Sequence, residues 1–153
     1  MEIAYLVGQI SPVSPESYKW RQDIKNHFEF NSNIEFIDPC NNAFNKKGLA
    51  KKKSAVTREK RSFGIDLLVP KDRSFVKRST IAMVNMNHFD PEKPLLGSFF
   101  ELAWYFDSPE KSVIAWSDDL LSYQCQHPFV QQAVTTWCRD TAEACYLVEK
   151  YFL

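Results

Sequence analysis

Five short apolar segments divide this chain of 153 residues, and they alternate with segments of helical spacing. The apolar segments are residues 3–8, 34–39, 80–87, 112–117 and 134–138. Short apolar runs bounded by Gly, Pro or polar residues are typical of strands that are buried on both faces. Strands that alternate with helices form a parallel sheet with helices on both sides. The sequence therefore predicts a single-domain α/β protein with a five-stranded, parallel, doubly wound sheet of the flavodoxin-like or Rossmann-like type.

Five further segments predict helices. They are residues 14–30, the part of 64–79 that starts near Asp72 and turns Phe75, Val76 and Ser79 inward, and residues 97–106, 127–133 and 139–153. Ser14 and Pro15 predict an N-cap and a first helical residue for the first helix. Asp140 with Glu143 predicts a capping box for the last helix.

The composition argues against a membrane protein. Hydrophobic residues make up 44% of the chain and charged residues 25%, and no apolar run approaches the roughly 18 residues of a membrane helix. Glu2 and the lack of a basic amino-terminal region disfavour a signal peptide.

The four cysteines form no C-x-x-C pair and no zinc-like pattern with histidine. They are Cys40, Cys125, Cys138 and Cys145. We therefore expect free thiols, no metal site, no membrane partner and a cytoplasmic location.

Positive charge is concentrated in residues 46–61, which hold eight Lys/Arg and one Glu in a chain of zero net charge. Three interpretations are open: a solvated basic loop over residues 40–62, a nucleic-acid patch, or a lid that attracts a phosphorylated small molecule. The basic residues have no interleaved aromatic residues to stack on bases, so nucleic acid is a disfavoured partner.

Motifs that bind nucleotide phosphates or activate a serine are absent. The sequence has no G-x-G-x-x-G after the first strand, no G-x-x-x-x-G-K-[ST] and no G-x-S-x-G. A dinucleotide cofactor, a P-loop nucleotide and a serine hydrolase are therefore disfavoured, and no cofactor is expected.

Ligands of doubly wound sheets bind at the carboxyl ends of the strands, where the strand order reverses. This rule selects candidate positions before any function is considered. They are Gly8, Gln9 and Ile10 after the first strand, Asp38 after the second, residues 85–90 after the third and residues 117–119 after the fourth.

The segment "GSFFELAWYF", residues 97–106, carries one carboxylate, Glu101, on a helix that is apolar nearly all round. No Lys or Arg lies three or four residues away on this helix. A buried carboxylate without a cation tends to have a raised pKa, and such groups are candidates for function. Gly97 allows close approach of a ligand, and Ser98 is expected to cap the helix. The alternative is that Glu101 reaches solvent or pairs with a distant Lys.

Several motifs in order resemble those of the nucleoside 2-deoxyribosyltransferase-like proteins. They are "YLVGQI", a helix with "WR", "IDP", an Asp that opens the helix before the third strand, "GSFFELAWY" and "HPF". Members of that family typically show Y-L-A-G-P, then D-x-x-x-I/V, then G-T/S-x-x-E-x-x-x-A/Y. The resemblance covers roughly residues 3 to 150, and its specificity lies in the order and spacing of motifs that are weak singly.

The resemblance implies three catalytic residues. Glu101 matches the glutamate that attacks the anomeric carbon and forms a covalent deoxyribosyl-enzyme. Tyr5 matches the tyrosine that orients this glutamate, and Asp72 matches an acidic residue that donates a proton to the leaving base. Retaining cleavage of a glycosidic bond needs such a pair of carboxyl groups.

The resemblance also implies residues that bind the substrate. Gly97 and Ser98 match small residues that let the sugar come close. His127 lies where many members have an Asn that a neighbouring subunit contributes to the 5′ end of the sugar, and Phe129 belongs to the same wall. Trp20 is a candidate for the flat base, with packing in the core as the alternative.

The sequence departs from the family pattern at Gln9, which replaces a Pro, at His127, and at Leu95, where an acidic sugar contact is common. Asp90 is a candidate replacement for that acid if its loop folds back. The expected function is transfer of 2-deoxyribose between bases, with two alternatives: hydrolysis of a nucleoside or a nucleoside 5′-monophosphate, or binding of a nucleotide without catalysis. A small-molecule nucleoside or nucleotide is the expected partner, in a homo-oligomer with shared active sites.

Overall fold

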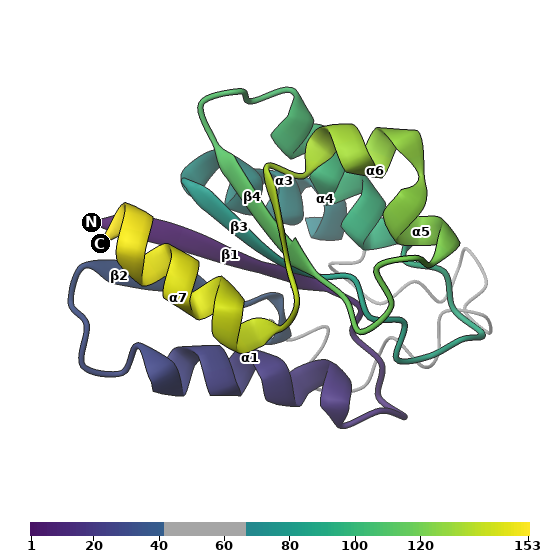
Figure 1. Ribbon diagram of the computed structural model, residues 1–153, viewed down its shortest axis with the longest axis horizontal. Helices are drawn as coiled ribbons and strands as arrows, with labels where there is room; N and C mark the ends of the chain where they lie inside the picture. The colour runs from purple at the N-terminus through teal and green to yellow at the C-terminus, as the bar shows by residue number, and fades with distance from the viewer. Residues whose placement is uncertain (42–66) are drawn as a thin grey trace.

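The computed structural model describes residues 1–41 and 67–153, and it contains one sheet of five parallel strands (Figure 1). The strands are β1 (Glu2–Gly8), β2 (Ile34–Ile37), β3 (Ile81–Asn85), β4 (Ser112–Trp116) and β5 (Thr136–Cys138). Their order in the sheet is β2-β1-β3-β4-β5. The predicted single-domain α/β fold and all five predicted strands are confirmed.

Helices cover both faces of the sheet. They are α1 (Glu16–His27), the short 3-10 helix η1 (Pro39–Asn41), α3 (Leu68–Arg78), α4 (Leu96–Phe106), α5 (Tyr123–Gln126), α6 (Pro128–Ala133) and α7 (Thr141–Phe152). In Figure 1, α1 and α7 lie on one side of the sheet, and the helices from α3 to α6 lie on the other. The arrangement is doubly wound, as the alternation of strands and helices predicted.

The alternation of side chains along β1 divides the core into two clusters. Ala4 and Leu6 pack with residues of α1 and α7, whereas Tyr5 and Val7 pack with residues of α3, α4 and α6. Successive side chains of a strand point to opposite faces of the sheet, so a tyrosine at position 5 must enter the cluster under α4.

Three predicted helix starts are wrong in detail. Pro15, not Ser14, occupies the N-cap position of α1, and no side chain caps this helix. The helix α3 begins at Leu68, one turn before Asp72. In α4 the N-cap residue is Leu95, so Ser98 lies inside the first turn and is buried against the core instead of capping. The helices α3 and α4 thus begin before the residue with capping propensity, whereas α1 begins one residue later than predicted.

The last helix begins as predicted, because Asp140 Oδ1 accepts a hydrogen bond of 2.8 Å from the Glu143 backbone N–H. The return bond of a capping box goes elsewhere: Glu143 Oε2 accepts from the Arg139 N–H at 2.7 Å. Thus the N-cap is confirmed, and the capping box is formed on one side only.

Three further points bear on the sequence predictions. All four cysteines are free, and three of them are buried. Within the described ranges, no helix has the length and apolarity needed to cross a membrane. The basic segment 46–61 and most of the predicted loop over 40–62 lie outside the described residues.

Candidate active site

The strand order reverses between β1 and β3, where β1 continues to β2 on one side and β3 to β4 on the other. Gly8 and Asn85, the last residues of the two strands, are partners in the register. In sheets of this order the crevice at that point is the usual ligand site. Functional side chains are therefore expected near the carboxyl ends of β1 and β3.

Glu101 on α4 and Tyr5 on β1 meet on the face of the sheet that α4 covers. Ser98, Glu101 and Tyr105 lie on the buried face of α4, and Glu101 is 8% exposed. The Tyr5 hydroxyl, which is fully buried, donates a hydrogen bond to Glu101 Oε1. The alternative that Glu101 reaches solvent is therefore wrong, and the carboxyl group is held by a side chain from the central strand.

The surroundings of Glu101 favour its protonated form. Burial raises the pKa of Glu101 to about 8, and the hydrogen bond from Tyr5 opposes this change by lowering it. The negative charge of Asp72 adds to the rise, and the positive charge of Arg21 opposes it. The pKa of Tyr5 is raised as well, by burial first and then by the charges of Glu101 and Asp72. Three of these groups, Tyr5, Asp72 and Glu101, are those that the sequence analysis selected.

Asp72 faces the site because of its position on α3. It is half-buried and shares a helix face with Phe75, Val76 and Ser79, at spacings of three, four and seven residues. Val76 and Ser79 are buried, and the Phe75 ring contacts Tyr5 edge-on with centroids 5.6 Å apart. The predicted inward face of this helix is thus present, with the carboxyl group of Asp72 at its amino-terminal end.

Tyr105 and Ser79 form a second buried polar pair, which the sequence analysis missed. Ser79 Oγ donates to the Val76 carbonyl at 3.0 Å, so its hydroxyl oxygen is left to accept the hydrogen bond that it shares with the Tyr105 hydroxyl. Burial, followed by the charge of Glu101, raises the pKa of Tyr105, against the effect of the Ser79 bond. The only sequence signal was Tyr105 four residues after Glu101, which places it on the same helix face.

Gln9 closes the loop between β3 and α4 onto the end of β1. Its Oε1 accepts from the Asp90 backbone N–H at 2.7 Å, and its Nε2 donates to the carbonyl groups of Asp90 (3.1 Å) and Lys93 (2.8 Å). We call these three hydrogen bonds the Gln9 clasp. A proline at position 9, as in the family pattern, has no side-chain group that can form them.

The Asp90 carboxylate is also held by its neighbours. Asp90 Oδ2 accepts from Ser11 Oγ at 3.0 Å and lies 3.3 Å from Lys93 Nζ. Burial acts to raise the pKa of Asp90, but the hydrogen bonds from Ser11 and Lys93 outweigh it, and the pKa is lowered. The loop of Asp90 does fold back, as it must if Asp90 is to replace the acidic sugar contact that is common at position 95. Leu95 itself is 3% exposed and belongs to the core cluster under α4, so in this chain position 95 serves packing.

Gly8 and Gly97 differ in what surrounds them. A Cβ atom on Gly8 would lie 3.0 Å from both the Asn85 carbonyl oxygen and the Trp20 ring, so a larger residue at this strand end would require these neighbours to shift. A Cβ atom on Gly97 would meet none of the described residues within 4 Å. As far as the described residues go, the space beside Gly97 is therefore open, as expected, whereas Gly8 is closely packed.

Trp20 and Ile10 lie at the edge of the predicted site. Trp20 is 6% exposed and belongs to the cluster with α1 and α7, and its ring contacts Trp116 edge-on at 5.4 Å. This position favours the packing alternative over contact with a base. Ile10 is half-buried in the loop that follows β1.

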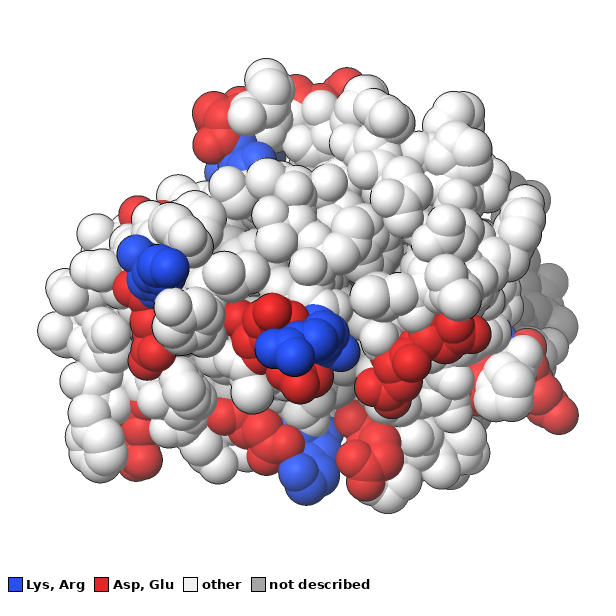
Figure 2. All heavy atoms as spheres, viewed as in Figure 1, with Lys and Arg blue, Asp and Glu red and all other residues white. Residues whose placement is uncertain are grey.

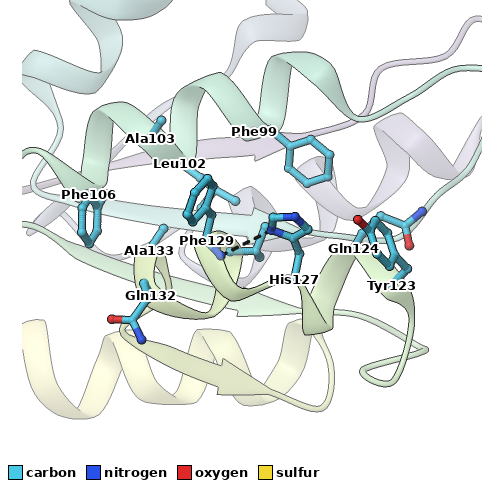
Figure 3. Close-up of a pocket in the computed structure, with 11 residues that line it drawn as sticks. Phe99, Leu102, Ala103, Phe106, Tyr123, Gln124, His127, Phe129, Gln132 and Ala133 are labelled. Atoms are coloured by element: carbon cyan, nitrogen blue, oxygen red, sulfur yellow. Dashed lines mark hydrogen bonds between the residues drawn. The ribbon is translucent and has the colours of Figure 1, made fainter.

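His127 and Phe129 lie in a separate, apolar groove between α4 and the pair α5–α6 (Figure 3). The groove has a volume of about 730 Å³, and Phe99, Leu102, Ala103 and Phe106 form its α4 side. Glu101 is not among the described residues that line it. His127 precedes Pro128 and is the N-cap residue of α6, which lies within the helix predicted over residues 127–133. Phe129 is 82% exposed.

The groups around Glu101 are carboxyl and hydroxyl groups, with one guanidinium group nearby. Within residues 1–41 and 67–153, no cluster of three or more His, Cys, Asp or Glu residues has the arrangement of a metal site. The candidate functional groups are the buried Glu101 carboxyl group and its hydrogen-bond donor, Tyr5.

Comparisons with known proteins concern the fold of the chain. No protein-family model matches the sequence, and no curated protein matches it. Among solved structures, the chain is similar to a 2-deoxyribosyltransferase from Leishmania mexicana, with a TM-score of 0.65, 12% identity, and coverage of 99% of this chain and 100% of the other. It is also similar to a conserved protein from Enterococcus faecalis V583, with a TM-score of 0.64, 10% identity, and coverage of 98% of both chains.

A third similar structure is a 2-deoxyribosyltransferase from Bacillus psychrosaccharolyticus, with a TM-score of 0.59, 13% identity, and coverage of 97% of this chain and 91% of the other. At these identities the likeness concerns the fold, and it extends over nearly the whole of each chain. This chain therefore has a nucleoside 2-deoxyribosyltransferase-like fold.

Proposed function

We propose that this protein cleaves the N-glycosidic bond of a nucleoside or nucleotide and transfers its 2-deoxyribose to another base. The observation that carries the proposal is the buried Glu101 carboxyl group, which receives a hydrogen bond from Tyr5 on the central strand β1. A structural carboxylate would be costly at this position, whereas a nucleophile needs a fixed orientation and exclusion of water. The likeness of the fold to 2-deoxyribosyltransferase structures supports the same class of reaction.

In the first half of the reaction, an ionised Glu101 oxygen attacks the anomeric carbon and forms an ester. The bond from that carbon to the base nitrogen breaks, and its electron pair stays on the base. A proton neutralises the base, and Asp72 is the candidate donor because its carboxyl group faces the Tyr5–Glu101 pair from α3. Tyr5 holds the attacking carboxylate in one orientation, which reduces the entropy cost of the step.

In the second half, a nitrogen of an incoming base or a water oxygen attacks the same carbon and releases Glu101 as a carboxylate. The proton lost by the acceptor returns to Asp72. Two displacements at one carbon retain its configuration. Transfer and hydrolysis differ only in the acceptor. The residues that surround the bound sugar therefore decide which of the two reactions occurs.

The proposal is tested with purified protein and a panel of deoxynucleosides and their 5′-monophosphates, with and without a free acceptor base. We expect base exchange, and Glu101→Gln is expected to abolish it. Glu29→Gln, which changes an exposed carboxylate at the end of α1, is the matched control. Base release without an acceptor identifies a hydrolase, and turnover restricted to monophosphates identifies a nucleotide substrate.

Two results contradict the assignment. A wild-type protein that releases no base from any substrate, but binds some of them, is a nucleotide-binding relative without catalysis. One observation favours that alternative: Leu95 packs in the core, and many transferases carry an acid at this position of the sequence. Full activity of Glu101→Gln would show that another group is the nucleophile.

We also propose that the protein forms a homo-oligomer through the groove between α4 and α5–α6. Around this groove the helices expose large apolar side chains: Phe100, Phe106, Tyr123 and Phe129 are each at least 60% exposed. Neither α5 nor α6 has a charged residue, and the surface over α6 is uncharged in Figure 2, whereas charged side chains gather over α1 and α7.

A second copy of the chain is the occupant that fits this surface. The groove and the projecting Phe129 ring belong to the same face, so the face offers both the hollow and the side chain that a two-fold related copy needs. Exposed apolar patches with a groove are typical of protein interfaces. Such an interface places His127 and Phe129 next to the partner, where the sequence resemblance expects residues that complete a neighbouring site.

A further inference from the structure

Half of the buried polar or charged residues that the structure describes are joined to one another at the carboxyl end of β1. They are Gln9, Ser11, Ser17, Arg21 and Asp90, each at most 8% exposed. Burial of a polar group costs free energy unless hydrogen bonds within the protein replace those to water. The hydrogen bonds of these five residues therefore show what they hold in place.

The guanidinium group of Arg21 binds two backbone segments from the α1 side of the sheet. One amino group donates to the Gly8 carbonyl at 2.8 Å, at the end of β1, and the other donates to the Ser17 carbonyl in the first turn of α1. The carboxylate of Asp38, directly after β2, lies 3.8 Å from Nε and supplies the opposite charge. The planar fork of Arg reaches several acceptors at once, which the single ammonium group of Lys does not.

Hydrogen bonds continue from the end of β1 to the loop after β3 and back to α1. The Gln9 clasp binds the backbone of Asp90. The Asp90 carboxylate accepts from Ser11 Oγ at 3.0 Å, and the Ser11 backbone N–H donates to Ser17 Oγ at 3.0 Å. These bonds form a closed ring, which we call the β1-edge ring and which consists of Arg21, Gly8, Gln9, Asp90, Ser11 and Ser17.

The β1-edge ring joins the two loops that flank the point where the strand order reverses. Residues 9–15 connect β1 to α1, and residues 86–95 connect β3 to α4, the helix of Glu101. Ligands of such sheets bind between these two loops. Buried hydrogen bonds that are all satisfied make the segments they join rigid.

We propose that Arg21 is a positioning residue of the ligand site: through the β1-edge ring it holds both loops in their final shape before a ligand binds. The inference rests on the proposed function only in taking that ligand to be the nucleoside or nucleotide substrate. Among the residues that the structure describes, Arg21 makes no hydrogen bond to residues 86–95. Its effect on that loop therefore passes through Gln9 or Ser11.

Amide hydrogen exchange of ligand-free protein, measured by mass spectrometry, tests this transmission. Arg21→Lys keeps the charge and removes the fork, so we expect exchange to be about 10-fold faster in residues 88–95 as well as in residues 9–15. Lys25→Met is the matched control, because it removes the other cation of α1 that contacts Asp38, at 2.7 Å, and leaves the ring intact. Exchange of residues 88–95 at the wild-type rate in Arg21→Lys overturns the proposal.

A double variant tests whether the bonds act together. Ser11→Ala removes the bond to the Asp90 carboxylate, on the side of the ring away from Arg21. The rest of the ring preorganises this bond, so its loss has a smaller effect once Arg21→Lys has opened the ring. We therefore expect the acceleration in residues 88–95 of the double variant to be less than the product of the two single accelerations. An acceleration equal to that product indicates independent contacts and overturns the proposal.

Ser17→Ala opens the ring at a third place and covers the case in which Arg21→Lys does not fold. It removes the hydroxyl group that accepts from Ser11 and leaves the α1 backbone unchanged. Faster exchange of residues 88–95 is expected here too, and an unchanged rate contradicts the ring.

Kinetics separate positioning from a general loss of structure. In active protein, Arg21→Lys is expected to raise KM about 10-fold and to change kcat by less than about two-fold, because the loops are then ordered only when the substrate binds. A fall in kcat at unchanged KM contradicts the positioning role. A wild-type protein that releases no base contradicts the proposed function, while the exchange measurements still decide whether Arg21 holds the loops.

Discussion

The hydroxyl group of Tyr5 donates a hydrogen bond to the Glu101 carboxyl group across the contact between β1 and α4. The two residues are 96 positions apart in the chain, and both are buried. The bond lowers the pKa of a carboxyl group that burial raises. It therefore acts on both the orientation and the protonation of the proposed nucleophile.

Loss of this bond is expected to weaken catalysis more than folding. Tyr5→Phe keeps the ring in the core and removes the donor, so we expect kcat/KM to fall about 10- to 100-fold, the equivalent of a hydrogen bond to a charged group. The pKa of Glu101 should rise, and the acid limb of the pH profile should move upward. Tyr151→Phe, on the exposed face of α7, is the control. Equal kcat/KM in Tyr5→Phe and the wild type would rule out the orienting role.

The pH dependence follows from the raised pKa of Glu101. The attacking group must be ionised, and in the free protein its pKa is about 8. We therefore expect kcat/KM to increase with pH through an acid limb with a midpoint near 8. The measurement is a pH–rate profile of base release. A limb with a midpoint near 4.5, the ordinary value of a glutamate, would show that burial does not control the nucleophile.

Glu101 is also expected to destabilise the protein at alkaline pH. Its folded pKa of about 8 lies above the ordinary 4.5, so the folded state holds a proton that the unfolded state loses between these values. The free energy of unfolding therefore decreases as pH rises from about 4.5 to about 8. Glu101→Gln removes this dependence and should be more stable than the wild type at pH 8, by an amount on the order of 1–4 kcal/mol.

Urea unfolding at pH 5 and pH 8 measures this difference. The stability gain of Glu101→Gln should be small at the lower pH and large at the higher pH. Glu29→Gln, which changes an exposed carboxylate, should show no such pH dependence. A gain of the same size at both pH values would instead indicate better packing of the amide.

The Gln9 clasp is expected to hold the loop after β3 in place. Gln9→Ala removes three hydrogen bonds to the backbone of Asp90 and Lys93, at a cost of about 1–3 kcal/mol. We expect faster amide hydrogen exchange in residues 88–95, measured by mass spectrometry, and a higher KM if this loop borders the sugar. Gln22→Ala breaks an exposed side-chain bond to Asn26 and is the control. Unchanged exchange in Gln9→Ala would show that the loop is held by other contacts.

The proposed oligomer interface predicts a difference between two exposed phenylalanines. Phe129→Ser changes the groove between α4 and α5–α6, whereas Phe30→Ser changes a ring that is 96% exposed after α1. We expect Phe129→Ser to shift the protein toward the monomer in sedimentation-velocity experiments, and Phe30→Ser to leave its mass unchanged. A wild-type protein that is monomeric at all concentrations contradicts the interface.

Local periodicity was sufficient to predict the fold class. The strands are short and apolar because both of their faces are covered, and this pattern is visible without knowledge of their partners. The exact starts of α1, α3 and α4 were not predictable in this way, because Pro15, Leu68 and Leu95 begin or cap helices without a capping side chain. Packing against the sheet decides how far those helices extend.

The sequence by itself determined the parallel sheet, the single carboxylate on an apolar helix, and the resemblance that selected Tyr5, Asp72 and Glu101. Only the tertiary structure decided that Tyr5 is bonded to Glu101, that Gln9 holds the loop of Asp90, and that Arg21 reaches the end of β1. The reason is physical: a residue's helix or strand face follows from its neighbours in the chain, but its contacts depend on which elements the sheet brings together. Hydrogen bonds between β1, α1, α4 and the loops at the carboxyl edge join residues that no local pattern connects.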